Sequence, residues 1–425
     1  MRLTALPAVL LAVSALALSA SACTRAASAP TGAVRIGTAA QIPIAQLLNE
    51  VPLIDGHNDL IIHFVDWGTG KTMPPEGYDI RRPTMGQSDL PRMRKGQLGA
   101  AIFTIWTSDD ANPKPGLEES IGLFRTLAAQ NPGDLAVVTS PDELISAHAA
   151  GKIAIMMGVE GGNPVEGDLG LLGWMRDHGV VEMGLVWSTN GLGTAGRTKA
   201  QPQGLTDLGR NAVVEMNRLG LIIDLSHASN ATVRDTVALS RVPVIDTHAI
   251  AARFSSGEEH LTADSMKAIA SGGGLVMPMF IPESMDPAYF AWGKRRDAHF
   301  TEVAVRLMGE EGKNQIAFLP WPDAIAKEME PWFAENPPPK LDIGNVADVY
   351  DHVRSIVGID HIGIGSDFDG MGFHPSNQHP AMRDVSYLPA LLEELRRRGW
   401  SDEDLKKLAG LNFLRVWRAI RAGAG

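Results

Sequence analysis

Residues 153–160 read Ile-Ala-Ile-Met-Met-Gly-Val-Glu, so an apolar run ends in one acidic residue, and two glycines follow it. A short run rich in Ile, Val and Met is typical of a strand that is buried on both faces of a parallel sheet. The predicted strand spans residues 153–159, and Glu160 stands at its carboxyl end. This stretch therefore predicts a parallel sheet with a polar group at its edge.

Amphipathic sequence separates this run from seven others of the same kind. Residues 208–219 and 387–398 carry apolar side chains at three- and four-residue spacing, which predicts helices, and Thr262 and Ser401, each with acidic residues after it, predict helix starts. Eight strand–helix units in 425 residues predict an α/β fold, a (β/α)₈ barrel of the TIM type, although a doubly wound open sheet fits the same pattern. The other runs are 51–55, 100–106, 182–187, 221–225, 242–246, 274–280 and 361–365.

One stretch interrupts the alternation, residues 282–345 after the seventh predicted strand. It contains three tryptophans, many charges and three consecutive prolines. A connection this long in a compact domain is usually a functional lid or an elaboration with helices of its own. We therefore expect one barrel domain, residues 41–425, that carries residues 282–345 as an insertion.

The first forty residues predict export. Residues 1–22 combine a short basic start, an apolar run and small residues, as in a secretory signal peptide. Cys23, the only cysteine in the chain, stands where bacterial lipoproteins attach lipid, and residues 23–40 have the composition of a flexible tether. We expect a protein of the cell envelope that is anchored at Cys23; the alternative is a plain secretory signal and a secreted or periplasmic protein.

The overall composition limits which classes of partner the protein can bind. A formal net charge of −11 argues against a nucleic-acid partner, which would require a basic face. Apolar residues make up 44% of the chain, which is enough for a large core. We expect contact with a membrane only through the N-terminal lipid, and a homodimer is possible.

Ionisable residues gather at the carboxyl ends of five predicted strands, which is the face where barrels of this type carry their chemistry. A single strand-end histidine is more often a structural hydrogen-bonding group than a ligand. Six such groups in one barrel mouth, however, would be costly to bury without cations, and imidazole with carboxylate is a ligand set that suits zinc. The six residues are His57, Asp59, Glu160, His227, His248 and Asp367.

Several motifs around these residues resemble those of the membrane (renal) dipeptidases, a family of binuclear zinc peptidases. The resemblance extends from about Val51 to about Trp417, apart from the insertion. It rests on Leu-Ile-Asp-Gly-His-Asn-Asp at 53–59, Gly-Val-Glu-Gly at 158–161, Asn-Arg-Leu-Gly at 217–220 before Asp-Leu-Ser-His at 224–227, and Gly-Ile-Gly-Ser-Asp-Phe-Asp-Gly at 363–370, with further matches at 89–92 and 412–416.

The resemblance implies a zinc-dependent dipeptidase with two zinc ions per chain, and thus a small peptide or amide substrate. One zinc would be held by His57 and Asp59, the other by His227 and His248, and Glu160 would bridge the two. A hydroxide between the metals would attack the peptide bond. Asp367 would transfer the proton. Three acids just before the ligands could orient the imidazoles: Asp55, Asp224 and Asp246.

The sequence departs from the family at two positions that would contact the substrate. Trp187 stands where the family has a histidine after the fourth strand. Where the family has an arginine for the substrate carboxylate, this chain has Glu258, Glu259 and His260, and Arg253 is the only nearby cation. Either substrate selection differs, with Arg253 and Trp187 as the substrate-binding candidates, or the alignment shifts by a loop residue or two.

Two other functions fit parts of the pattern. One is a metal-dependent amide hydrolase or tailoring enzyme on the same scaffold, with a substrate that is not a dipeptide. The other is an envelope lipoprotein that binds a ligand without catalysis. A carboxylate such as Asp367 beside a full set of metal ligands speaks against the second, because binding alone does not require a proton-transfer group.

Overall fold

The computed structural model describes residues 42–66, 71–72, 77–106, 113–196, 203–255, 260–315, 321–370 and 374–425. The predicted signal peptide and tether, with Cys23, lie outside these residues, as do Glu258 and Glu259. Residues 42–425 form one unit by their internal contacts.

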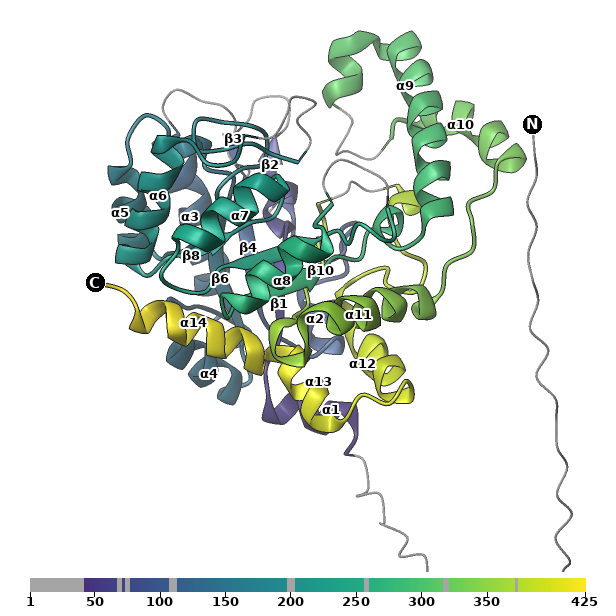
Figure 1. The fold of residues 1–425 in the computed structure, drawn as a ribbon. Coiled ribbons are helices and arrows are strands. Elements are labelled where there is room, and N and C mark those ends of the chain that lie inside the picture. The colour runs from purple at the N-terminus through teal and green to yellow at the C-terminus, as the bar shows by residue number, and fades with distance from the viewer. Residues whose placement is uncertain are drawn as a thin grey trace, which may run out of the picture. The chain divides into compact units, whose positions relative to one another are not determined.

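Seven strands pair side by side in a parallel sheet (Figure 1), and their order in space follows their order in the chain. Each corresponds to one of the predicted runs. The strands are β1 (Leu53–Asn58), β4 (Leu98–Trp106), β6 (Ile153–Glu160), β7 (Val180–Gly184), β8 (Ile222–Asp224), β9 (Ile245–Ala249) and β10 (Leu275–Pro278).

The eighth predicted run brings the two edges of this sheet together. Parallel bridges join Val276 of β10 to Ile362, and Asp55 and Asn58 of β1 to Ile364 and Phe368. Residues 362–368 therefore lie between β10 and β1, and the sheet is nearly closed into a barrel. The prediction of a TIM-like barrel is confirmed, and the alternative of an open doubly wound sheet is wrong.

Helices surround this sheet (Figure 1). The predicted helix starts are correct, because Thr262 caps α8 by accepting a hydrogen bond from Ser265 N and Ser401 caps α13 in the same way. The α-helices outside the insertion are α1 (Ile44–Glu50), α2 (Leu90–Lys95), α3 (Lys114–Gln130), α4 (Pro141–Ala149), α5 (Gly170–Asp177), α6 (Asp207–Leu219), α7 (Asn230–Leu239), α8 (Ala263–Ser271), α11 (Ile343–Val357), α12 (Leu388–Arg397), α13 (Asp402–Lys406) and α14 (Asn412–Ala422).

Three short strands, several 3-10 turns and one π-helical turn, η8 (Lys407–Leu411), complete the described elements. Strand β5 (Leu135–Val137) pairs with the start of β6, and β2 (Val65–Asp66) pairs with β3 (Lys71–Thr72). The sequence did not predict these strands. The 3-10 turns are η1 (Leu60–Phe64), η3 (Asn163–Val165), η4 (Pro282–Ser284), η5 (Ile359–His361), η6 (Pro375–Asn377) and η7 (Val385–Tyr387).

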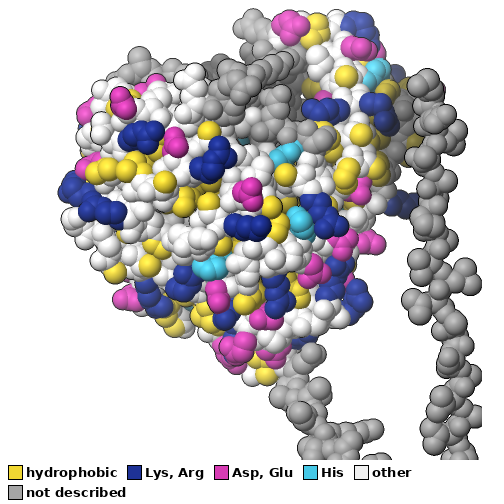
Figure 2. Space-filling model, viewed as in Figure 1, with side chains coloured by type: hydrophobic (Ala, Val, Ile, Leu, Met, Phe, Trp, Pro, Cys, Tyr) yellow, Lys and Arg dark blue, Asp and Glu magenta, His cyan; other side chains and the backbone are white. Residues whose placement is uncertain are grey.

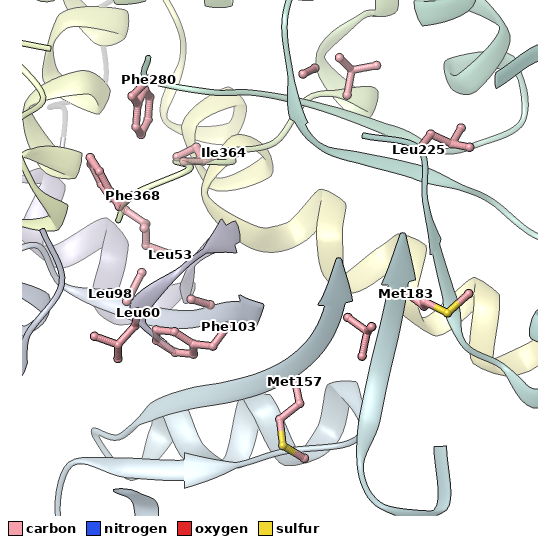
Figure 3. Packing of buried hydrophobic residues seen from close by; sticks show 14 of the residues in the cluster. Leu53, Leu60, Leu98, Phe103, Met157, Met183, Leu225, Phe280, Ile364 and Phe368 are labelled. Carbon is pink, nitrogen blue, oxygen red and sulfur yellow. The ribbon is translucent and has the colours of Figure 1, made fainter. Parts of the chain in front are cut away.

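The strands are buried on both faces. Neighbouring residues of one strand belong to different hydrophobic clusters: Phe103 and Met157 pack in one (Figure 3), and Ile102 and Met156 pack in the other, together with Trp417 of α14. Successive side chains of a strand point to opposite faces, so this division places half of each strand on either side of the sheet. The strands therefore form a rigid scaffold for the side chains at their carboxyl ends.

The described part of the insertion includes α9 (Pro287–Gln315), whose helical backbone is interrupted at Gly309, and α10 (Asp323–Glu335), and both stand outside the ring of helices (Figure 1). They pack on each other through a small core that includes Val303, Ile325 and Met329. Trp321, just before α10, stacks on His374, whose ring centroid lies 3.8 Å away. The insertion therefore contacts the loop that follows the barrel-closing segment.

The surface in view carries both signs of charge. Figure 2 shows acidic and basic side chains interspersed over this face, with apolar side chains scattered between them. Among the described residues, no helix combines the length and the apolar composition that a membrane span requires.

Candidate metal centre

Glu160 lies at the centre of the polar group that the strand ends assemble. Its Oε1 is 2.8 Å from Nε2 of His227, 3.6 Å from Nε2 of His248 and 3.8 Å from Nε2 of His57. These histidines come from the ends of β8, β9 and β1, and Glu160 is the last residue of β6. One carboxylate oxygen thus faces three imidazole nitrogens from three other strands.

A second group adjoins the first on the side of β1. Nε2 of His57 is 3.4 Å from Oδ2 of Asp59, and the ligating atoms of these two residues and of Asp367 all lie within 4.8 Å of one another. His57, Glu160 and His248 meet the same criterion. All six residues that the sequence singled out are therefore brought together, as two adjoining groups that share His57.

The backbone is strained at this end of the barrel. His227, Asp367 and Asp369 have φ angles of 63°, 57° and 72°, a left-handed conformation that only one other described non-glycine residue adopts. Such a conformation costs on the order of 1–3 kcal/mol for each residue and persists where the surroundings enforce it. Here Gly196 N donates to the carbonyl of His227, and Asp367 N donates to the carbonyl of His57.

Buried hydroxyl groups contact the far sides of two imidazoles. Oγ1 of Thr104 is 3.3 Å from Nδ1 of His57, and Oγ1 of Thr247 is 3.0 Å from Nδ1 of His248. Nε2 of each ring therefore faces the centre. Nε2 of His57 is buried and has no hydrogen-bond partner among the described residues. A buried lone pair without a partner is costly, and a cation bound here would satisfy it, so the nitrogen and oxygen donors fit zinc.

The three acids predicted to orient the imidazoles contact hydroxyl and amide groups instead. Asp55 accepts hydrogen bonds from the amide and hydroxyl of Ser366, at 2.7 and 2.6 Å. Asp224 accepts from the amide of Thr247 at 2.8 Å and from its hydroxyl at 3.0 Å, and Asp246 accepts from the hydroxyl of Ser226. Asp224 therefore reaches His248 through Thr247.

Burial strongly perturbs these acids. It raises the pKa of Asp55 to about 6, and burial together with the nearby Asp224 raises the pKa of Asp246 to about 7. Burial, followed by the charge of Asp59, raises the pKa of Asp367 well above its ordinary value. Burial and crowding thus disfavour the charged form of these carboxyl groups, which is the electrostatic situation that bound cations would relieve.

A further acid, not predicted from the sequence, lies inside the barrel. Glu182 of β7 is 3% exposed, and a β-carbon at Gly158 would lie 2.1 Å from its Oε2, so the carboxyl group occupies the space left by that glycine. Burial, followed by the charge of Asp224, raises the pKa of Glu182 well above its ordinary value. The available signal was an acidic residue within a predicted strand that is otherwise apolar.

Asp369 shapes the turn after Asp367. Its Oδ1 lies 2.8 Å from Nε2 of His63 and accepts a hydrogen bond from the amide of Gln87, and its own amide donates to Oε1 of Gln87. His63 stacks on Tyr78, with ring centroids 4.4 Å apart. This buried cluster fixes the segment that presents Asp367.

The two substrate-binding candidates lie in different places. Trp187 is beside the centre, because its ring centroid is 6.2 Å from that of His227, and a β-carbon at Gly161 would lie 3.1 Å from its Cβ. Arg253 turns toward α11 instead. Its Nη1 is 3.4 Å from Nδ1 of His352, and its guanidinium lies 5.7 Å from the ring centroid of Phe254.

Known proteins resemble this chain in sequence. A family model described as membrane dipeptidase, peptidase family M19, matches residues 42–424. The rat protein dipeptidase 3 is 30% identical over 384 residues, which are 88% of this chain and 66% of the rat protein. The mouse protein dipeptidase 3 is 28% identical over 88% of this chain and 65% of its own length. The chain thus spans about two thirds of the length of these relatives.

Solved structures share the fold. The probable dipeptidase PvdM from Pseudomonas aeruginosa superposes with a TM-score of 0.70 and 25% identity, over 90% of this chain and 98% of its own. A metallopeptidase from Rhodobacter sphaeroides, solved with a phosphinate mimic of the dipeptide L-Ala-D-Ala, gives a TM-score of 0.62 and 23% identity, over 87% and 99%. The second likeness concerns the fold alone.

Proposed function

Because the chain belongs to the membrane dipeptidase family, peptidase family M19, we propose that it is a metallo-dipeptidase that hydrolyses the peptide bond of a dipeptide with two zinc ions bound. The observation that carries this proposal is the convergence of three histidines on one oxygen of Glu160, each within 3.8 Å. The unpartnered Nε2 of His57 supports it, because that atom is positioned to donate its lone pair.

The residues divide into two sets of ligands. His57 and Asp59 would hold one ion, His227 and His248 would hold the other, and Glu160, which faces all three histidines, would contribute to both sites. Two divalent cations at these positions would activate a water molecule near neutral pH and polarise the scissile carbonyl. The chain supplies the ligands from rigid strand ends, so the spacing of the two sets is fixed by the barrel.

Asp367 transfers the proton. Its carboxyl group lies next to Asp59, and the left-handed backbone at φ 57° holds it there. Burial raises its pKa, so the group can accept a proton from the attacking water and hold it until the leaving amine requires it. The neighbouring His63–Asp369 contact keeps this segment in place.

The direct test uses the purified protein with dipeptides of both stereochemistries, with and without added zinc. We expect hydrolysis that depends on the metal and stops on chelation. A protein that binds two zinc ions but cleaves none of the dipeptides would instead support the second candidate, an amide hydrolase with another substrate. That candidate is favoured by Trp187 beside His227 and by the contact of Arg253 with His352.

A further inference from the structure

Thr247 lies between Asp246 and His248 on β9, and its side chain is completely buried. Its Oγ1 is 3.0 Å from Nδ1 of His248, 3.5 Å from Nδ1 of His57 and 3.0 Å from Oδ2 of Asp224. We propose that this one hydroxyl group positions a ligand of each metal ion and thereby couples the two halves of the centre. The inference rests on the proposed two-metal function.

The contacts of Thr247 assign a direction to each hydrogen bond. A hydroxyl group has one proton to donate and two lone pairs. Asp224 already accepts hydrogen bonds from two amides, those of Thr247 and Ser226, and so it accepts the hydroxyl proton as well. The hydroxyl of Ser226 also lies 3.0 Å from Oγ1 of Thr247, but its single proton is taken by a carboxylate, that of Asp224 or Asp246. The two lone pairs of Thr247 therefore remain for the Nδ1–H groups of His248 and His57.

This assignment fixes the form of both imidazoles. A neutral ring that carries its proton on Nδ1 has its lone pair on Nε2, the atom that faces the centre in His57 and His248. The ring centroids of these two histidines are 3.9 Å apart, so they pack against each other above the hydroxyl. Loss of the hydroxyl would remove an Nδ1 contact from both rings, and His57 would keep its second contact, with Thr104.

Thr104 provides a matched control within the same chain. It is equally buried, and its Oγ1 is 3.3 Å from Nδ1 of His57. Among the described residues its hydroxyl contacts an imidazole of only one set of ligands. A valine at either position keeps the volume and removes the hydroxyl, so the two variants separate an effect on one metal from an effect on both.

The experiment measures zinc affinity of the full chain by chelator competition, together with the thermal stability of the metal-free protein. Thr247→Val should lower the affinity for both zinc ions by about 10–100-fold, the usual cost of removing a group that orients a ligand. Thr247→Ser keeps the hydroxyl and should have an affinity near that of wild type. Thr104→Val should lower the affinity for one zinc ion only. Equal affinities in Thr247→Val and wild type, or weakening of one ion alone, would overturn the proposal.

Asp224→Asn tests the same hydrogen bonds if Thr247→Val does not fold. The side-chain amide of the asparagine can donate to Oγ1 of Thr247 and so occupies a lone pair that the imidazoles need. We therefore expect a lower affinity for both zinc ions. Wild-type affinities in Asp224→Asn would contradict the assignment. A wild-type chain that binds fewer than two zinc ions would refute the proposed function itself, which is a different result from normal binding in the variants.

Discussion

The amide of Asp367 donates a hydrogen bond of 3.1 Å to the carbonyl of His57, and this bond joins the barrel-closing segment to the end of β1. The two side chains are thereby held on neighbouring backbones, but the bond does not involve either side chain. A change in the carboxyl group of Asp367 should consequently leave His57 where it is. This separation makes the role of Asp367 testable.

Asp367→Asn should retain two metal ions and lose turnover by roughly a hundredfold or more, the usual scale for removal of a general acid–base group. Metal content by elemental analysis and kcat for a cleaved dipeptide measure the two effects. Asp360→Asn, on the outer surface beside Lys407, is the control and should change neither. Loss of metal together with activity would identify Asp367 as a ligand.

The wild-type protein should carry two divalent ions per chain, and chelation should abolish hydrolysis. His227→Ala should lower the metal content because it removes a ligand. His178→Ala should leave the metal content unchanged, because the ring of His178 stacks on Trp174 away from the centre. Full activity with a single strongly held ion would refute the bridging role of Glu160.

Simple dipeptides should be poor substrates compared with forms whose C-terminal side is blocked, extended or bulky. A guanidinium normally recognises a substrate carboxylate, and Arg253 contacts His352 instead. The comparison is kcat/KM for matched free-acid and amide forms of one dipeptide, in wild type and in Arg253→Ala. A wild-type preference for the free acid that disappears in Arg253→Ala would refute this prediction.

His63→Ala should lower the free energy of unfolding by about 1–3 kcal/mol, because it leaves the buried Oδ1 of Asp369 without one of its donors. Denaturant unfolding of the metal-free protein measures this change. His63→Gln, which can still donate a hydrogen bond, should recover part of the loss. Equal stability in His63→Ala and wild type would show that the contact contributes nothing to the turn.

Cys23 should be the mature N-terminus and should carry lipid, as the sequence around it predicts. Mass spectrometry of the protein extracted from membranes would detect the acyl mass on this residue. A soluble form that begins at another residue would contradict the prediction and favour a plain secretory signal.

The barrel was predictable because each strand is a local feature of the sequence. The eight apolar runs match seven strands and the closing segment, and the largest displacement is at β9, which begins and ends three residues later than predicted. At β7 the predicted run extends three residues past the strand, because Leu185 and Val186 are buried outside the strand and so continue the apolar run. Burial alone does not mark where hydrogen bonding between strands stops.

The hydroxyl contacts were not predictable, because they join residues that are far apart in the sequence. Thr104 and Thr247 are 47 and 190 residues away from His57, so their approach depends on the register of whole strands. A threonine is also a common strand residue, and nothing in its immediate neighbours distinguishes one that contacts an imidazole. Ligands gathered at strand ends can be found from sequence, but the groups that orient them require the structure.

Closure by residues 362–368 also sets the order in which the chain can fold. Until these residues leave the ribosome, β1 and β10 each have an edge without a partner, and unpaired edges invite association with other chains. Asp367 lies in the same stretch, so the centre is completed in the step that removes the exposed edges. A nascent or truncated chain that ends before residue 362 would be prone to aggregate and would also lack its proton-transfer group.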